Sequence, residues 1–231
     1  MKEIVQDRNA EELAALMAEL GEPRYRAGQL ARAIARGGRV SEFTELSRAL
    51  RERLLARFED EPVRIAEVLT AADGTEKYLF SLADGDLIEG VLMRYKYGNT
   101  QCVSTQVGCR MNCAFCASGL NGLVRNLSAG EILAQVLAVN ARAGGTPAKR
   151  AVTNLVLMGS GEPLDNYENV VKFLRLVTAE GGLNISPRNI SLSTCGIVPK
   201  MIALAEEGLP VNLTVSLHAV TDEERARTMP V

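Results

Sequence analysis

Tryptophan is absent from this chain, histidine occurs once, and phenylalanine and tyrosine occur five times each among 231 residues. No apolar run approaches the ~18 residues that a transmembrane helix needs, and the first residues lack the apolar stretch of a signal peptide. We therefore expect a soluble, cytoplasmic protein with no membrane partner. The 26 basic and 28 acidic residues are mixed and 47% of the chain is hydrophobic, which is typical of a folded protein. The length fits one large domain, with or without a small companion.

Cysteine is scarce but clustered. The chain has five cysteines, an odd number, and four of them lie between Cys102 and Cys116. A secreted disulfide scaffold would be shorter and would spread its cysteines along the chain. In a reducing compartment, closely spaced thiols indicate metal or redox chemistry instead.

Residues 1–60 are predicted to be helical, because apolar residues recur there at spacings of three and four. Between Arg24 and Arg57 this segment has nine arginines, no lysine and three glutamates, inside a chain with a net charge of −2. Two interpretations stay open. The arginines form an ordinary solvated helix face, or they form a patch that faces phosphate groups.

The rest of the chain changes pattern twice. Residues 61–101 alternate with a period of two, which predicts a short β-meander with strands at 63–69, 77–82 and 87–93. Residues 102–231 alternate between strands and helices, and Ser128 with Glu131 is a capping box that begins the first helix. Strands separated by helices favour a parallel sheet. We therefore predict an α/β fold, with a helical N-terminal domain, a β-meander connector and a partial (β/α) barrel over 102–231.

Cys109, Cys113 and Cys116 form a C-x₃-C-x₂-C motif directly after a segment expected to be a strand. Three thiolates on one loop can hold three irons of a [4Fe–4S] cluster and leave the fourth iron open for a substrate or cofactor. Structural zinc would fill all four positions, and the only histidine, His218, lies about a hundred residues away. Zinc and a disulfide are the less favoured alternatives.

With an aromatic residue before its last cysteine, this motif resembles the cluster motif of radical S-adenosylmethionine (SAM) enzymes. Flanking segments narrow the resemblance to the RlmN family of RNA adenine C2 methyltransferases, over the whole chain. These segments are Thr-Gln-Val-Gly at 105–108, Met-Gly-Ser-Gly-Glu-Pro-Leu at 158–164, Ser-Thr at 193–194 and Ser-Leu-His at 216–218. The resemblance implies a [4Fe–4S] cluster and SAM as cofactors, 23S rRNA and in some members tRNA as substrates, an electron donor such as flavodoxin, and a monomer. It also implies that residues 1–60 are an RNA-binding accessory domain.

The resemblance assigns roles to single residues. Cys109, Cys113 and Cys116 match the cluster ligands. The expected cofactor contacts are Gly161, Glu162, Ser193, Ser216, Leu217 and His218. Without the resemblance, the glycines would be read as an ordinary tight turn and the histidine as structural.

Glu89 matches the family's proposed proton acceptor for adenine C2, although by itself it would be read as a solvent-facing glutamate on a strand. Cys102 matches a catalytic cysteine that resolves the protein–RNA adduct through a transient disulfide with a second, C-terminal cysteine. By itself it would be a small buried apolar residue. Cys195 matches no catalytic cysteine, and we expect it to be structural.

In the family, the carbon passes through a methyl-cysteine near the C-terminus, and this chain has no cysteine after Cys195. We therefore expect the chain to be the N-terminal part of a longer enzyme. We also expect that this part is inactive by itself. Two other functions stay open. One is the sister activity at adenine C8, and the other is a non-catalytic, metal-holding RNA-binding fragment.

Overall fold

A computed structural model describes residues 2–231, and its N-terminal part is helical as predicted. Two of its helices begin at polar caps: Asn9 and Glu12 form a capping box, and the side chain of Ser47 accepts from the amide of Leu50. The helices are η1 (Val5–Asp7), α1 (Ala10–Glu19), α2 (Tyr25–Arg36), η2 (Val40–Glu42) and α3 (Arg48–Arg57).

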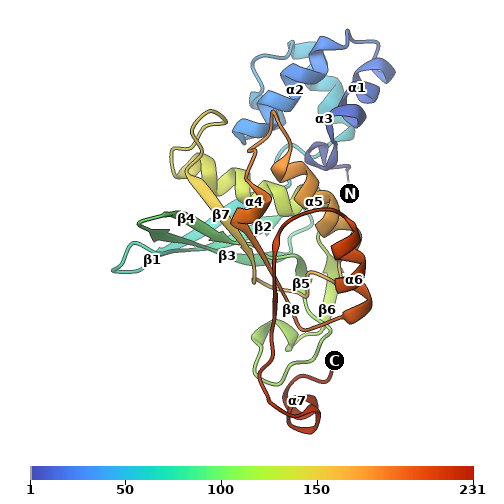
Figure 1. Cartoon of the computed structure of the whole chain (residues 1–231). Coiled ribbons are helices and arrows are strands. Elements are labelled where there is room, and N and C mark those ends of the chain that lie inside the picture. Colours follow the sequence, from blue (N-terminus) through green and yellow to red (C-terminus); the bar gives the residue numbers. More distant parts are fainter. Residues whose placement is uncertain (1) are drawn as a thin grey trace.

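The centre of the molecule is a sheet of seven strands in the order β1-β2-β3-β4-β7-β8-β9 (Figure 1). The first four strands pair antiparallel, whereas β4, β7, β8 and β9 pair in parallel. The sheet is open rather than closed into a barrel. Its strands are β1 (Val63–Thr70), β2 (Glu76–Leu82), β3 (Leu87–Tyr95), β4 (Gly98–Cys102), β7 (Val152–Leu157), β8 (Ile190–Thr194) and β9 (Asn212–Val215).

The β-meander is continuous with the barrel half. The boundary expected between residues 101 and 102 falls inside β4, which pairs with β3 on one side and with β7 on the other. The meander is therefore the antiparallel half of the same sheet. The sequence pattern missed this because β4 (Gly-Asn-Thr-Gln-Cys) is polar and has no apolar alternation.

Helices connect the parallel strands, as the alternation of patterns predicted. The capping box of Ser128 and Glu131 begins α4, and Thr221 caps α7 through the amide of Glu224. The strand expected directly before the cysteine motif is β5 (Gln106–Gly108), but its pairing in a small hairpin with β6 (Leu123–Asn126) was not predicted. The remaining elements are η3 (Ala117–Gly119), α4 (Ala129–Arg142), α5 (Tyr167–Thr178), η4 (Pro187–Asn189), α6 (Val198–Glu206) and α7 (Asp222–Thr228). No helix among residues 2–231 has the length and apolarity to cross a membrane.

The two faces of the sheet differ in character. One face contributes buried apolar side chains to the core, and the helices α4 and α5 lie on this side (Figure 1). The other face is open, and its side chains are mostly polar or half-exposed. One row of register partners crosses this open face from β3 to β9: Val91, Cys102, Val156, Ser191 and Asn212.

Candidate active site

The three motif cysteines lie on a loop that follows β5. Gly108 has a φ of +76°, and a Cβ atom there would lie 2.0 Å from the carbonyl oxygen of Gly122, so only glycine lets the two chains come this close. The amide of Cys109 donates to that same carbonyl at 3.0 Å, and the amide of Cys116 donates to the carbonyl of Cys113 at 3.1 Å. The loop is therefore anchored at its start and folded back on itself.

Residues distant in sequence cover this loop. The rings of Phe115 and His218 lie 4.5 Å apart between centroids, and the amide of Ala114 donates to the carbonyl of Thr228 at 2.8 Å. His218 has a φ of +58°, an uncommon backbone conformation for a residue other than glycine. The segment after β9 thus places the only histidine against the cysteine motif.

The thiols on the loop are half-exposed and unbonded to one another. Burial raises the pKa of the Cys109 and Cys113 thiols. All five cysteines are free in residues 2–231, so the transient disulfide expected for Cys102 has no counterpart in the described chain. Nor do three or more histidine, cysteine or acidic side chains gather in the described residues as a single metal ion would require. Three thiol donors on one accessible loop do fit a [4Fe–4S] cluster, whose irons take cysteine thiolates.

The loop after β7 presents Glu162, whose buried carboxylate accepts three hydrogen bonds. Its donors are the Thr194 hydroxyl at 2.6 Å, the Cys195 amide at 2.8 Å and the Leu164 amide at 3.0 Å. A carboxylate has about four acceptor positions, so about one remains for another donor. Glu162 therefore ties the end of β8 to the end of β7, and it keeps little capacity for the amine of a cofactor.

Gly159 and Gly161 allow this loop to approach the end of β4. A Cβ atom on Gly159 would lie 2.6 Å from the Ser104 hydroxyl, and one on Gly161 would lie 2.5 Å from Cβ of Gln106. Gly161 also has a φ of +100°. The tight turn proposed as the alternative interpretation is thus present, and the exclusion of side chains is required for packing.

The ends of β8 and β9 bring the remaining expected contacts together. The hydroxyls of Ser193 and Ser216 lie 3.5 Å apart, and Leu217 is 64% exposed beside them in sequence. The ends of β7, β8 and β9 meet at the carboxyl edge of the parallel strands, which is where sites form in barrels of this kind. The structure therefore places all of the expected cofactor contacts at one edge.

Glu89 and Cys102 lie on adjacent strands of the open face. Cys102 pairs in register with Val91, two residues from Glu89 on β3, so both side chains are on the same face. The Glu89 side chain is 55% exposed and forms an ion pair with Lys77 at 2.7 Å. Burial raises the pKa of the Cys102 thiol. Glu89 is accessible from solvent, as a proton acceptor for a large substrate must be.

Cys195 is buried directly after β8. Burial, together with the neighbouring Glu162, raises the pKa of its thiol strongly, and its carbonyl accepts from the guanidinium of Arg225. A thiol so fully protonated is a poor nucleophile or metal ligand. This position agrees with the structural role expected for Cys195.

Sequence reasoning missed a polar bridge between the loop after β7 and the cysteine loop. The Gln106 side chain accepts from the amide of Glu162 at 2.8 Å and donates to Asp165 at 2.9 Å. Arg110, inside the cysteine motif, bonds the same Asp165 carboxylate. Burial would raise the pKa of Asp165, but the bonds from Arg110 and Gln106 outweigh it and lower the pKa. No spacing rule connects residues 55 positions apart, so only the fold reveals this bridge.

The arginine-rich segment is largely engaged within the N-terminal part. Seven of its nine arginines have a side-chain hydrogen bond or ion pair there, for example Arg53 with Glu22 at 3.0 Å and Arg57 with Glu19 at 2.9 Å. Arg24 and Arg32 have none among the described residues. Both interpretations of this segment, a solvated helix face and a phosphate-facing patch, therefore stay open. Fewer arginines are available to bind phosphate than the nine in the sequence suggested.

Comparison with known proteins agrees with this geometry. Residues 103–230 match the model of the radical SAM superfamily. The chain is 51% identical over its full length to a probable dual-specificity RNA methyltransferase RlmN of Clostridium botulinum (strain Eklund 17B / Type B), and it spans 65% of that protein. A protein of the same name from Lachnoclostridium phytofermentans is 50% identical, with 96% of this chain and 62% of that protein covered.

A solved structure supports the same relationship. The crystal structure of a radical SAM methyltransferase from Sphaerobacter thermophilus matches with a TM-score of 0.93 and 42% identity, over 99% of this chain and 67% of that one. The likeness extends over the helical N-terminal part, the meander and the open parallel sheet together. The chain therefore belongs to the radical SAM superfamily and, within it, to the RlmN family.

Proposed function

We propose that this chain carries the cluster and cofactor site of an RNA methyltransferase that places a methyl group on C2 of adenine in 23S rRNA and in tRNA. The observation that carries the proposal is the convergence of two features at one sheet edge. The three motif thiols follow β5, and the polar ends of β7, β8 and β9 lie at the same edge. The names of the relatives, which describe dual-specificity RNA methyltransferases, support an RNA substrate.

In this proposal Cys109, Cys113 and Cys116 hold a [4Fe–4S] cluster. When bound, such a cluster supplies the single electron for reductive cleavage of SAM. The hydroxyls of Ser193 and Ser216, 3.5 Å apart, contact the cofactor from the strand ends. Glu162 fixes the loops on which those contacts depend, and the contact between the rings of Phe115 and His218 joins the cysteine loop to the segment after β9.

Glu89 is the proposed acceptor of the proton that leaves adenine C2. Its exposed carboxylate is on the open face of the sheet, next to the strand that carries Cys102. The ammonium of Lys77 forms an ion pair with this carboxylate at 2.7 Å and so holds it in place on the open face. Cys102, half-buried, is the proposed thiol that releases the product from the protein.

The proposal extends to partners and location. An electron donor such as flavodoxin would supply the electron, the enzyme would act as a monomer, and the reducing cytoplasm would keep the five thiols free. The cysteine that carries the methyl group and later pairs with Cys102 would be a further cysteine, different from the five described.

Cluster assembly is the first test. After anaerobic incubation with iron and sulfide, the chain is expected to bind about four irons and four sulfides, as a [4Fe–4S] cluster requires. Cys113→Ala is expected to lose the cluster, whereas Cys195→Ala, a matched substitution at the buried thiol, is expected to keep it. Zinc bound without sulfide would overturn the proposed enzymatic function and would favour a non-catalytic, metal-holding RNA-binding protein.

The modified carbon is the second part of the test. Adenosine from 23S rRNA and tRNA fragments, treated with a full-length RlmN-family enzyme carrying these residues and analysed by mass spectrometry, is expected to carry the methyl group at C2. The group at C8 would assign the sister activity instead. Glu89→Gln in the same enzyme is expected to lower the methylation rate by about 10²–10⁴-fold, the usual contribution of a general base.

A further inference from the structure

The outer end of the β-meander carries an exposed pair of stacked tyrosines. Tyr95 ends β3 and Tyr97 lies in the turn before β4, with ring centroids 5.0 Å apart and planes inclined by 9°. Tyr95 is 46% exposed and Tyr97 is 73% exposed. The chain has only ten phenylalanine and tyrosine residues, so two of them held in solvent at one turn is a feature that core packing does not explain.

One cation lies in the same turn. Lys96 stands between the two tyrosines and is exposed, whereas Arg94, next to Tyr95 on β3, points to the opposite face of the sheet. The loop before β7 reaches the same turn, because the Asn99 side chain donates to the carbonyl of Ala151 at 3.0 Å, and this loop contributes the exposed Lys149.

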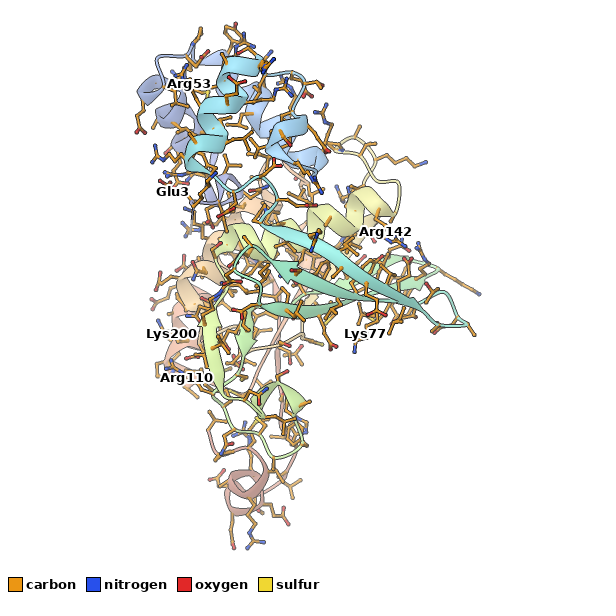
Figure 2. The ribbon with its side chains drawn as sticks, turned by 180° about the vertical axis from the view of Figure 1, so that it is seen from behind. Glu3, Arg53, Lys77, Arg110, Arg142 and Lys200 are labelled. Carbon is orange, nitrogen blue, oxygen red and sulfur yellow. The ribbon has the colours of Figure 1, made fainter. Side chains whose placement is uncertain are left out.

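The opposite face of the same outer strands carries two further arginines, bound to one carboxylate. Glu76 pairs in register with Leu92, so Glu76 and its arginine partners are on the helix-covered face and not on the face of the tyrosines. Glu76, whose side chain is 14% exposed, bonds Arg94 at 2.8 Å and lies 4.0 Å from Arg142. The two arginine side chains are still 43% and 47% exposed, so each keeps donors free for a further anion. Figure 2 shows Arg142 beside the outer strands, where the meander projects from the body of the molecule.

The tyrosines are on the same face of the sheet as the candidate reaction residues. Along β3, Tyr95 shares its face with Met93, Val91 and Glu89, and its hydroxyl contacts the sulfur of Met93 at 3.4 Å. Six residues of strand separate Tyr95 from Glu89, a length of about 20 Å. A strip of open sheet therefore leads from the tyrosine pair to the proposed proton acceptor.

We propose that Tyr95 and Tyr97, with Lys96 in the same turn and Lys149 on the neighbouring loop, form a stacking platform for unpaired bases of the RNA substrate. Aromatic faces bind unstacked bases of any sequence, and the two lysines match the phosphates that accompany them. An adenine at Glu89 would then belong to a single-stranded segment whose neighbouring nucleotides follow β3 outward. This inference rests on the proposed RNA substrate, and it adds where that RNA is held.

Fluorescence anisotropy with a labelled, adenine-rich single-stranded RNA tests the platform on the full chain. Tyr97→Ala is expected to weaken binding roughly tenfold, since one base–aromatic stack is lost. Tyr97→Phe, the matched control, keeps the ring and is expected to bind as the native chain does. Lys96→Gln is expected to flatten the dependence of log affinity on log salt by about 0.7. An RNA duplex of equal length is expected to be insensitive to Tyr97→Ala, because its bases are already stacked.

The outcomes separate the two proposals. If the native chain binds the RNA and Tyr97→Ala binds it equally well, the platform is wrong and the RNA substrate stands. If the native chain binds no RNA, the platform and the RNA substrate of the proposed function both fail. Circular dichroism of each variant shows whether the fold is retained, and retention is expected because both tyrosines are exposed.

Discussion

At the scale of single residues, the site depends on a few buried polar groups that have several partners each. Glu162 accepts from two side-chain or backbone groups of the β8 end and one of its own loop, and Gln106 links it onward to Asp165. A buried acceptor that loses a donor incurs the cost of its desolvation. These residues therefore control both stability and the positions of the β8 end, which carries Ser193, and of the loop that carries the motif cysteines.

Thr194→Val tests this dependence. Valine keeps the shape of threonine but removes the hydroxyl that donates to Glu162 at 2.6 Å. The free energy of unfolding is expected to fall by about 1–3 kcal/mol, because the buried carboxylate loses one of its three hydrogen-bond donors. Urea denaturation measures the change. Thr70→Val, at the exposed end of β1, is the control and is expected to change stability by less than about 0.5 kcal/mol. Equal effects in the two variants would contradict the role given to Thr194.

At the scale of elements, the helices and strands follow local rules that the sequence displays. The capping boxes at Asn9 and Ser128 begin α1 and α4, and each predicted strand of the meander is present within two residues of its expected bounds. The packing of one element against another cannot be seen in these local patterns. Two glycines within helices illustrate this, because one has room beside its Cα atom and the other is in close contact with a neighbouring segment.

Gly28 in α2 and Gly130 in α4 are expected to respond oppositely to alanine. Around Gly28 a Cβ atom would meet only the flexible Arg32 side chain at 3.6 Å, so Gly28→Ala is expected to stabilise the protein by about 0.5–1 kcal/mol. At Gly130 it would lie 2.7 Å from the amide nitrogen of Asp7, so Gly130→Ala is expected to destabilise by about 1–3 kcal/mol. The midpoint of urea denaturation measures the change in stability of each variant. If both substitutions stabilise the protein, the close contact of η1 with α4 at Gly130 is wrong.

At the scale of the whole molecule, the N-terminal helices and the barrel half are held together by contacts at α4 and α5. The amide of Gly130 donates to the Asp7 carboxylate at 2.5 Å, and Lys172 on α5 forms an ion pair with Glu12 on α1 at 2.9 Å. Burial raises the pKa of Asp7 despite the bond from Gly130. The folded protein therefore binds a proton at Asp7 more readily than the unfolded chain does.

This shift has a definite sign. Because the folded pKa lies above the ordinary 3.8, the contribution of Asp7 to stability declines as the pH rises through that raised value. Asp7→Asn keeps an oxygen acceptor for Gly130 and has no charge to bury. The variant is expected to be at least as stable as the native chain at pH 7 and to lose this advantage as the pH falls toward 4. Urea denaturation across this range measures the difference, and a variant less stable by the same amount at every pH would refute the assignment.

The sequence by itself determined the class of fold, the positions of most elements and the three motif cysteines. Each of these depends on local spacing, since periodicity sets helices and strands and a short loop sets thiols close together. The resemblance, which also depends on short motifs, supplied the residues expected to contact the cofactor, and the structure brings those residues to one edge of the sheet.

Only the tertiary structure decided how these parts relate. It joined the meander to the parallel strands through the polar β4, bonded Gln106 to Asp165, which is 59 residues further along the chain, and bonded most of the N-terminal arginines to nearby acids. It also raised the stacked Tyr95 and Tyr97 onto the face that carries Glu89. These features are contacts between distant residues, and such contacts depend on strand order and register, which no single segment of sequence specifies.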